Sequence, residues 1–81
     1  MTYIATFYSH FGAIRFKKLC GQKGWSARVM PVPRDLSSSC GTCVRYEGTD
    51  HRPSEDLPEE VEQIVQVTET GYHLLFKAEG A

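Results

Sequence analysis

The sequence lacks several features that would assign it to well-known classes. It has no apolar run near the roughly 20 residues of a membrane-spanning helix, and no glycine-rich phosphate-binding signature. Residues 1–7 lack the basic lead and long apolar stretch of a signal peptide. The three cysteines are an odd number, which does not fit a secreted disulfide framework. No basic run is interleaved with aromatic residues. We therefore expect a cytoplasmic protein with free thiols that binds neither membranes nor nucleic acid.

The chain is too short for more than one domain. Its 81 residues predict one domain over residues 1–81, with a modest core and no room for a separate cofactor-binding unit. A hydrophobic content of 41% argues for a folded chain rather than a disordered one. We therefore expect a small globular domain with no cofactor.

Charge is divided between the two halves of the chain. Residues 1–46 contain seven Lys or Arg and one acid, a balance of +6, whereas residues 47–81 contain two basic and nine acidic residues, a balance of −7. Two interpretations are open. The basic half neutralises the acidic half within the fold, or it presents a basic surface to an anion or an acidic partner.

The pattern of apolar and turn residues predicts six elements in the order β-α-β-β-α-β. This order is typical of the ferredoxin-like fold of the α+β class. We expect a four-stranded antiparallel sheet with two helices on one face, and the open face could form a homodimer. The predicted strands cover residues 3–8, 26–32, 42–47 and 72–77, and the predicted helices cover residues 10–22 and 58–68.

The second predicted helix depends on a short segment of acidic and apolar residues. Pro58 suits the first turn of a helix, and the acids that follow it suit the positive end of the helix dipole. Val61, Ile64, Val65 and Thr68 recur at helical spacing. In this arrangement the acidic second helix lies beside the basic first helix.

A loop rich in serine and cysteine carries the strongest chemical signal. Cys40 has small polar neighbours, and Gly41 can take the positive φ that lets backbone N–H groups turn toward a sulfur atom. Nearby arginines would also favour the thiolate, which is the reactive form of cysteine. The alternative is a flexible serine linker that contains a cysteine. The predicted substrate-binding residues are Arg34, Ser38, Ser39, Gly41 and Arg45.

Cys43 completes a C-x-x-C motif with Cys40. In an extended strand these residues would lie about 10 Å apart, whereas a disulfide needs Cα atoms within about 7 Å. A disulfide therefore requires a turn at residues 41–42. The pair could supply two of the four ligands of a structural zinc site, but the sequence has no second ligand pair at diagnostic spacing, so we predict no metal.

Two further residues have alternative interpretations. His10 follows the predicted helix cap Ser9, and it is either an acid–base partner for Cys40 or a solvated residue of the first turn. Cys20 falls on the predicted core face of the first helix, where a thiol would be buried and inert.

Two segments of the sequence resemble a known family. Residues 2–10, TYIATFYSH, and residues 31–41, PVPRDLSSSCG, are similar to the selenium/sulfur (Se/S) carrier-like family of small bacterial proteins. The family's defining cysteine corresponds to Cys40, and the resemblance implies transient carriage of sulfur or selenium on that thiol. Cys43 departs from the common pattern of the family.

We therefore predict a carrier that holds a persulfide or selenosulfide on Cys40 and passes the atom on, rather than a true enzyme. Cys43 or a partner thiol would release the atom. The expected partners are proteins that donate and accept sulfur or selenium. Two alternatives stay open: a small dithiol redox or metal-binding adaptor that uses both cysteines, and a thiol-independent dimeric interaction module.

Overall fold

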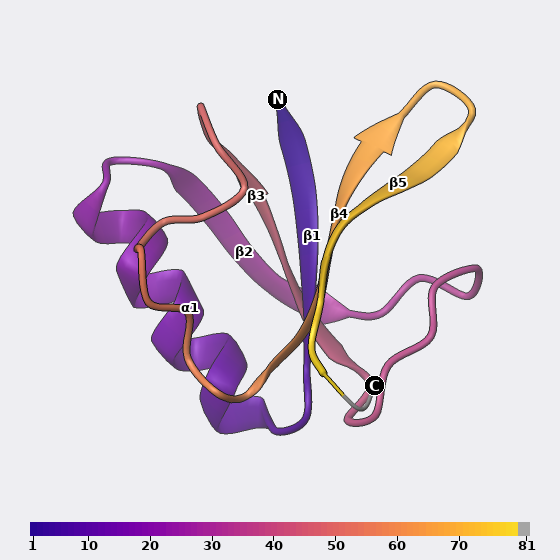
Figure 1. Ribbon diagram of the computed structural model, residues 1–81, viewed down its shortest axis with the longest axis horizontal. Helices are drawn as coiled ribbons and strands as arrows, with labels where there is room; N and C mark the ends of the chain where they lie inside the picture. Colours follow the sequence, from indigo (N-terminus) through magenta and orange to yellow (C-terminus); the bar gives the residue numbers. More distant parts are fainter. Residues whose placement is uncertain (80–81) are drawn as a thin grey trace.

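Five antiparallel strands and one α-helix form the described part of the protein, residues 1–79 of a computed structural model (Figure 1). The sheet order is β2-β3-β1-β4-β5, so β1 lies at the centre. The predicted ferredoxin-like fold, with four strands and two helices on one face, is therefore wrong. The elements are β1 (Thr2–Phe7), α1 (His10–Gln22), β2 (Ser26–Pro31), β3 (Thr42–Glu47), β4 (Val61–Thr68) and β5 (Gly71–Lys77).

The error lies in the predicted second helix, whose place is taken by β4. This strand pairs with β1 on one side and β5 on the other, and its pairing with β1 contains a β-bulge at Glu62. The extra residue places Val61 and Ile64 in the same core although they are three positions apart, while Val65 contacts the opposite face. A bulged strand with both faces partly buried therefore reproduces the apolar spacing of a helix.

The helix was predicted correctly and covers one face of the sheet. Ser9 caps its N-terminus, where the Ser9 hydroxyl oxygen accepts a hydrogen bond of 3.4 Å from the Gly12 N–H. The ring of Phe16 packs edge-on between Phe7 and Tyr46, at centroid distances of 5.4 and 5.1 Å. These residues belong to the first core, between α1 and the sheet. The helix is too short and too polar to cross a membrane.

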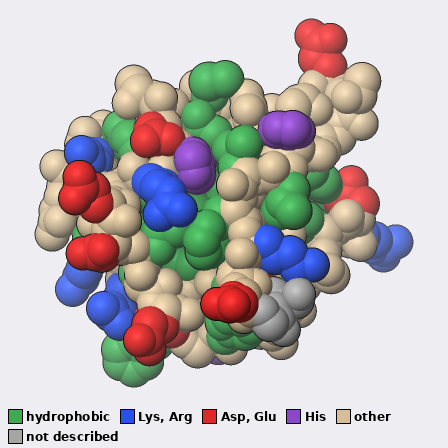
Figure 2. Space-filling model, viewed as in Figure 1, with side chains coloured by type: hydrophobic (Ala, Val, Ile, Leu, Met, Phe, Trp, Pro, Cys, Tyr) green, Lys and Arg blue, Asp and Glu red, His purple; other side chains and the backbone are tan. Residues whose placement is uncertain are grey.

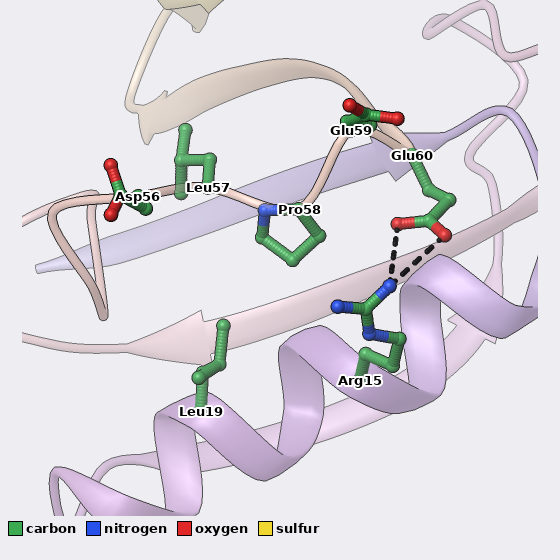
Figure 3. Close-up of a pocket in the computed structure, with 7 residues that line it drawn as sticks. All are labelled: Arg15, Leu19, Asp56, Leu57, Pro58, Glu59 and Glu60. Carbon is green, nitrogen blue, oxygen red and sulfur yellow. Dashed lines mark hydrogen bonds and ion pairs between the residues drawn. The ribbon is translucent and has the colours of Figure 1, made fainter.

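Residues 56–60 run beside α1, where the second helix was expected (Figure 1). Arg15 Nη1 lies 3.3 and 3.2 Å from the two carboxylate oxygens of Glu60, and a hollow of about 410 Å³ lies between α1 and residues 56–60 (Figure 3). Leu57 packs against the first core. Acidic and basic side chains alternate over this part of the surface (Figure 2). The contact between Arg15 and Glu60 joins the basic and acidic halves of the chain, in place of the expected pairing of two helices.

The second face of the sheet, opposite α1, is partly covered by the chain itself. Val32 and Leu36, in the segment between β2 and β3, pack against a small cluster formed by Ile4, Cys43 and Val65. The Tyr72 hydroxyl also donates a hydrogen bond of 2.9 Å to Asp35, in the same segment. The expectation that the chain leaves this face open is therefore wrong. A homodimer on this face stays a prediction.

Gly12 should be indispensable to the packing of α1. A methyl group at this position would overlap Cβ of Glu60 and lie 3.1 Å from Cδ1 of Phe7. We expect Gly12→Ala to destabilise the protein by about 1–3 kcal/mol, although alanine favours a helix by about 1 kcal/mol over glycine. The measurement is urea unfolding.

Gly21→Ala is the matched control in the same helix, because no atom lies within 4 Å of a methyl group built there. This variant should be as stable as the wild type or slightly more stable. Equal behaviour of the two variants would contradict the packing described for α1.

Candidate functional site

One end of the sheet brings the predicted cysteine loop together with the start of α1. The loop precedes β3, whose first residues pair with the end of β1. The Thr42 hydroxyl and His10 Nδ1 are hydrogen-bonded at 2.6 Å, which joins the start of β3 to the first residue of α1. The bulge of β4 lies at the same end, because Glu62 contacts both Thr6 and the loop. Segments distant in the sequence therefore meet around Cys40.

Cys40 lies in this loop with its side chain half-buried. It packs against the edge of the first core, and its thiol donates a hydrogen bond to the carbonyl oxygen of Thr42, with 3.6 Å between the sulfur and the oxygen. The next residue, Gly41, has a φ of +76°, so the predicted positive φ is confirmed. A residue with a side chain would be strained in this conformation. The turn at Gly41 therefore sets the direction of the backbone between Cys40 and the start of β3.

Glu62 anchors the loop, and sequence reasoning missed it. Its carboxylate accepts hydrogen bonds from the Ser39 N–H at 3.2 Å, the Ser39 hydroxyl at 2.6 Å and the hydroxyl of the fully buried Thr6 at 3.1 Å. Gln63 adds a hydrogen bond of 2.9 Å from its side-chain amide to the Ser37 carbonyl oxygen. The backbone N–H of Ser39 therefore donates to a carboxylate of the chain rather than to the Cys40 sulfur. No local signal in the sequence marks Glu62, because the bulge that places it beside the loop depends on the pairing of β4 with β1.

Ser38 contributes a hydroxyl with no partner. Its oxygen is buried and makes no hydrogen bond within residues 1–79. Buried hydroxyl groups are usually hydrogen-bonded, so Ser38 is an exception within the loop.

The two other cysteines are fully buried. Burial raises the pKa of the Cys43 thiol, the neighbouring Cys40 raises it further, and Arg45 lowers it. The Cys43 thiol donates to the Pro31 carbonyl oxygen, 3.7 Å away, and packs on the second face of the sheet. All three cysteines are free thiols in the structure. The C-x-x-C motif therefore places one thiol near the first core and the other on the opposite face.

Cys20 should make stability depend on alkaline pH. Burial raises the pKa of its thiol to about 11, partly opposed by a backbone hydrogen bond. Because the folded protein holds this proton more tightly than the unfolded chain, the stabilisation is complete below about pH 8.5 and is lost as pH rises toward the folded pKa. A shift of this size corresponds to about 2–3 kcal/mol.

Urea unfolding in reductant between pH 7 and 10 measures the effect. The wild type should lose stability more steeply than Cys20→Ala over this range. The comparison with the variant isolates Cys20, because every other titrating group is kept. Parallel curves for the two proteins would contradict the burial of an uncharged thiol at this position.

A comparison with models of known families confirms the resemblance that was suggested by the sequence. The family model described as "Putative Se/S carrier protein-like" matches residues 2–73. The chain belongs to this family. No curated protein and no solved structure matches the chain significantly.

The predicted arginines of this Se/S carrier-like protein are both exposed. Arg34 is exposed in the turn between β2 and β3. Arg45 is also exposed, and it lies two residues along β3 from Cys43. Neither arginine takes part in the two ion pairs within residues 1–79, which are Arg15–Glu60 and His51–Asp50. Their predicted role in binding substrate stays a prediction.

The family's name refers to selenium and sulfur as cargo and does not imply a resident metal. Among residues 1–79, no three His, Cys, Asp or Glu side chains come together in a group that could hold a metal ion. The cysteine loop of this Se/S carrier-like protein therefore carries a half-buried thiol and is held at Ser39 by the carboxylate of Glu62 and at Thr42 by His10.

Proposed function

We propose that this protein carries sulfur or selenium on Cys40 and delivers the atom to a partner protein. The observation that supports the proposal is the difference in burial among the three cysteines. Cys20 and Cys43 have no exposed surface, whereas Cys40 is half-buried in a loop. A thiol must meet its reaction partner to exchange an atom, so accessibility singles out Cys40. The family name supports the same cargo.

The transfer we propose is a pair of exchange reactions at sulfur. The Cys40 thiolate attacks the terminal sulfur of a donor persulfide, R–S–SH. A new bond forms between Cys40 Sγ and that sulfur, the bond to R–S breaks, and R–S⁻ leaves with the electron pair. An acceptor thiolate then attacks the same sulfur, and Cys40 leaves as a thiolate. A donor with selenium in the terminal position gives the selenosulfide, and no external oxidant or reductant is consumed.

The residues around Cys40 have separate roles in this proposal. Glu62 holds the loop through Ser39, so the thiol keeps a defined direction rather than moving with a flexible linker. His10 Nδ1 is hydrogen-bonded to the hydroxyl of Thr42, and the carbonyl oxygen of Thr42 accepts from the Cys40 thiol, so His10 helps to hold the residue that orients the thiol.

A single thiol is sufficient for this cycle. A dithiol mechanism would require Cys43 to reach the same sulfur, but Cys43 is fully buried and its thiolate is disfavoured by burial. We therefore assign release of the cargo to a thiol of the acceptor. This assignment distinguishes the carrier from the dithiol adaptor, which needs both cysteines.

Mapping the site of loading tests the proposal. The wild-type protein is incubated with a low-molecular-weight persulfide in the absence of oxygen. Its free thiols are then alkylated, and the protein is digested with trypsin. Cys40 and Cys43 fall in the same tryptic peptide, residues 35–45, so fragmentation of that peptide is needed to separate them. We expect the added sulfur on Cys40. Sulfur on Cys43 or Cys20, or no loading of any cysteine, would contradict the proposal.

A further inference from the structure

We propose that Arg28 and Arg45 form a binding site for a phosphate group on the second face of the sheet. The two residues lie directly opposite each other on adjacent antiparallel strands, β2 and β3. Residues paired in this way project from the same face of a sheet, with Cβ atoms about 4.5–5.5 Å apart. Both arginines are exposed. The site does not depend on the function proposed for Cys40.

A hollow accompanies the arginine pair. It has a volume of about 180 Å³, which is enough for a tetrahedral oxyanion and some of its water. The guanidinium group is planar and donates parallel hydrogen bonds, which suits it to two oxygens of one phosphate. A phosphate between the two guanidiniums would therefore accept from both side chains. The hollow is lined by Ser26, Arg28, Arg45, Tyr46 and Glu47.

The two positive charges of the arginine pair favour the binding of an anion between them. Like charges directly opposite each other on a sheet are destabilising. Neither Arg28 nor Arg45 takes part in an ion pair within residues 1–79. The carboxylate of Glu47 also lines the hollow and accepts from the Thr2 hydroxyl at 2.8 and 2.7 Å; its single negative charge offsets part of the positive charge of the two arginines. A phosphate would relieve the repulsion that the fold leaves in place.

The site is separate from the cysteine loop. Arg45 is three residues along β3 from Thr42, which is about 10 Å at the rise of a β-strand. An anion held there contacts neither the Cys40 sulfur nor the carboxylate of Glu62. The ligand is a phosphate group, either free or as the end of a small phosphate ester.

Titration of the ¹⁵N-labelled protein with inorganic phosphate tests the site, with sodium chloride at equal ionic strength as the control for screening. We expect chemical-shift changes at residues 26–28 and 45–47 that saturate with phosphate and do not occur with chloride. Arg28→Gln and Arg45→Gln should each weaken binding at least tenfold. Lys17→Gln, an exposed charge change on α1, should leave binding unchanged. Shifts that are spread over all basic residues, or that survive in Arg28→Gln, would overturn the proposal.

Thermal stability gives a second measurement that does not depend on assigned spectra. Phosphate should raise the melting temperature of the wild type relative to chloride, and this increase should be lost in Arg28→Gln. In chloride alone, Arg28→Gln should melt no lower than the wild type, because it removes a repulsive pair. A phosphate-dependent increase that is equal in the wild type and the variant would overturn the proposal.

A titration with glycerol phosphate then distinguishes the source of the ligand. Tighter binding of the ester favours a phosphate ester, and tighter binding of inorganic phosphate favours the free ion.

Discussion

Cys40→Ser is expected to abolish the loading of sulfur or selenium while leaving the protein folded. The substitution removes the nucleophile, and a hydroxyl group does not replace a thiolate in exchange at sulfur. The side chain is half-buried at the edge of the first core, so its loss should change the free energy of unfolding by less than about 1 kcal/mol. Intact mass after treatment with a persulfide donor measures loading, and urea unfolding measures stability.

The matched control is Cys43→Ser, which separates the three functional hypotheses. The carrier proposal predicts that Cys43→Ser still loads, although it should be less stable because it places a hydroxyl group at a fully buried position. A dithiol adaptor would lose function in either variant. An interaction module that does not use its thiols would keep its function in both. Full loading of Cys40→Ser would exclude the carrier proposal.

Glu62→Ala is expected to have the second-largest effect, because one carboxylate joins the cysteine loop to the centre of the sheet. The substitution leaves the Ser39 N–H and the buried Thr6 hydroxyl without their acceptor. Loss of a charged acceptor and an unsatisfied buried hydroxyl together should cost about 2–4 kcal/mol. The released loop should also expose Cys40, so its alkylation by iodoacetamide should be several-fold faster than in the wild type.

Two further variants make the result for Glu62 specific. Glu62→Gln keeps one acceptor oxygen and should fall between the wild type and Glu62→Ala in both measurements. Glu59→Ala removes an exposed carboxylate only three residues earlier and should leave stability and alkylation close to the wild type. If Glu62→Ala alkylates no faster than Glu59→Ala, the loop is not anchored through Glu62.

Local patterns in the sequence were sufficient for most individual elements. The helix at residues 10–22 has a clear N-cap and regular apolar spacing, and the strand before it is rich in β-branched and aromatic residues. In β4 the local signals disagreed. Its apolar spacing favoured a helix, whereas its β-branched residues Val61, Ile64, Val65 and Val67 favour a strand. The bulge that reconciles them depends on pairing with β1, about 55 residues earlier in the chain, and a local pattern does not show such pairing.

The same limitation applies to the candidate site. The positive φ of Gly41 followed from its place in a serine-rich turn, and the loop position of Cys40 followed from the lack of apolar residues around it. The contact of Glu62 with this loop was not predictable, because it joins segments that are remote in the sequence. His10 was one of two alternatives in the sequence analysis, and the structure places it against Thr42 at the end of the loop. Because residues 58–68 were assigned to a helix beside α1, Glu62 was not considered as a contact of the loop. The error in the fold therefore concealed the anchor of the site.

The central claim, that Cys40 carries the cargo, is tested most directly by intact mass spectrometry of the protein purified without reductant. The account predicts a fraction of molecules heavier by one sulfur or one selenium atom, an increase that disappears after treatment with excess thiol and is absent from Cys40→Ser. The contrary result is wild-type protein with three unmodified thiols in every preparation, or the same added mass in Cys40→Ser.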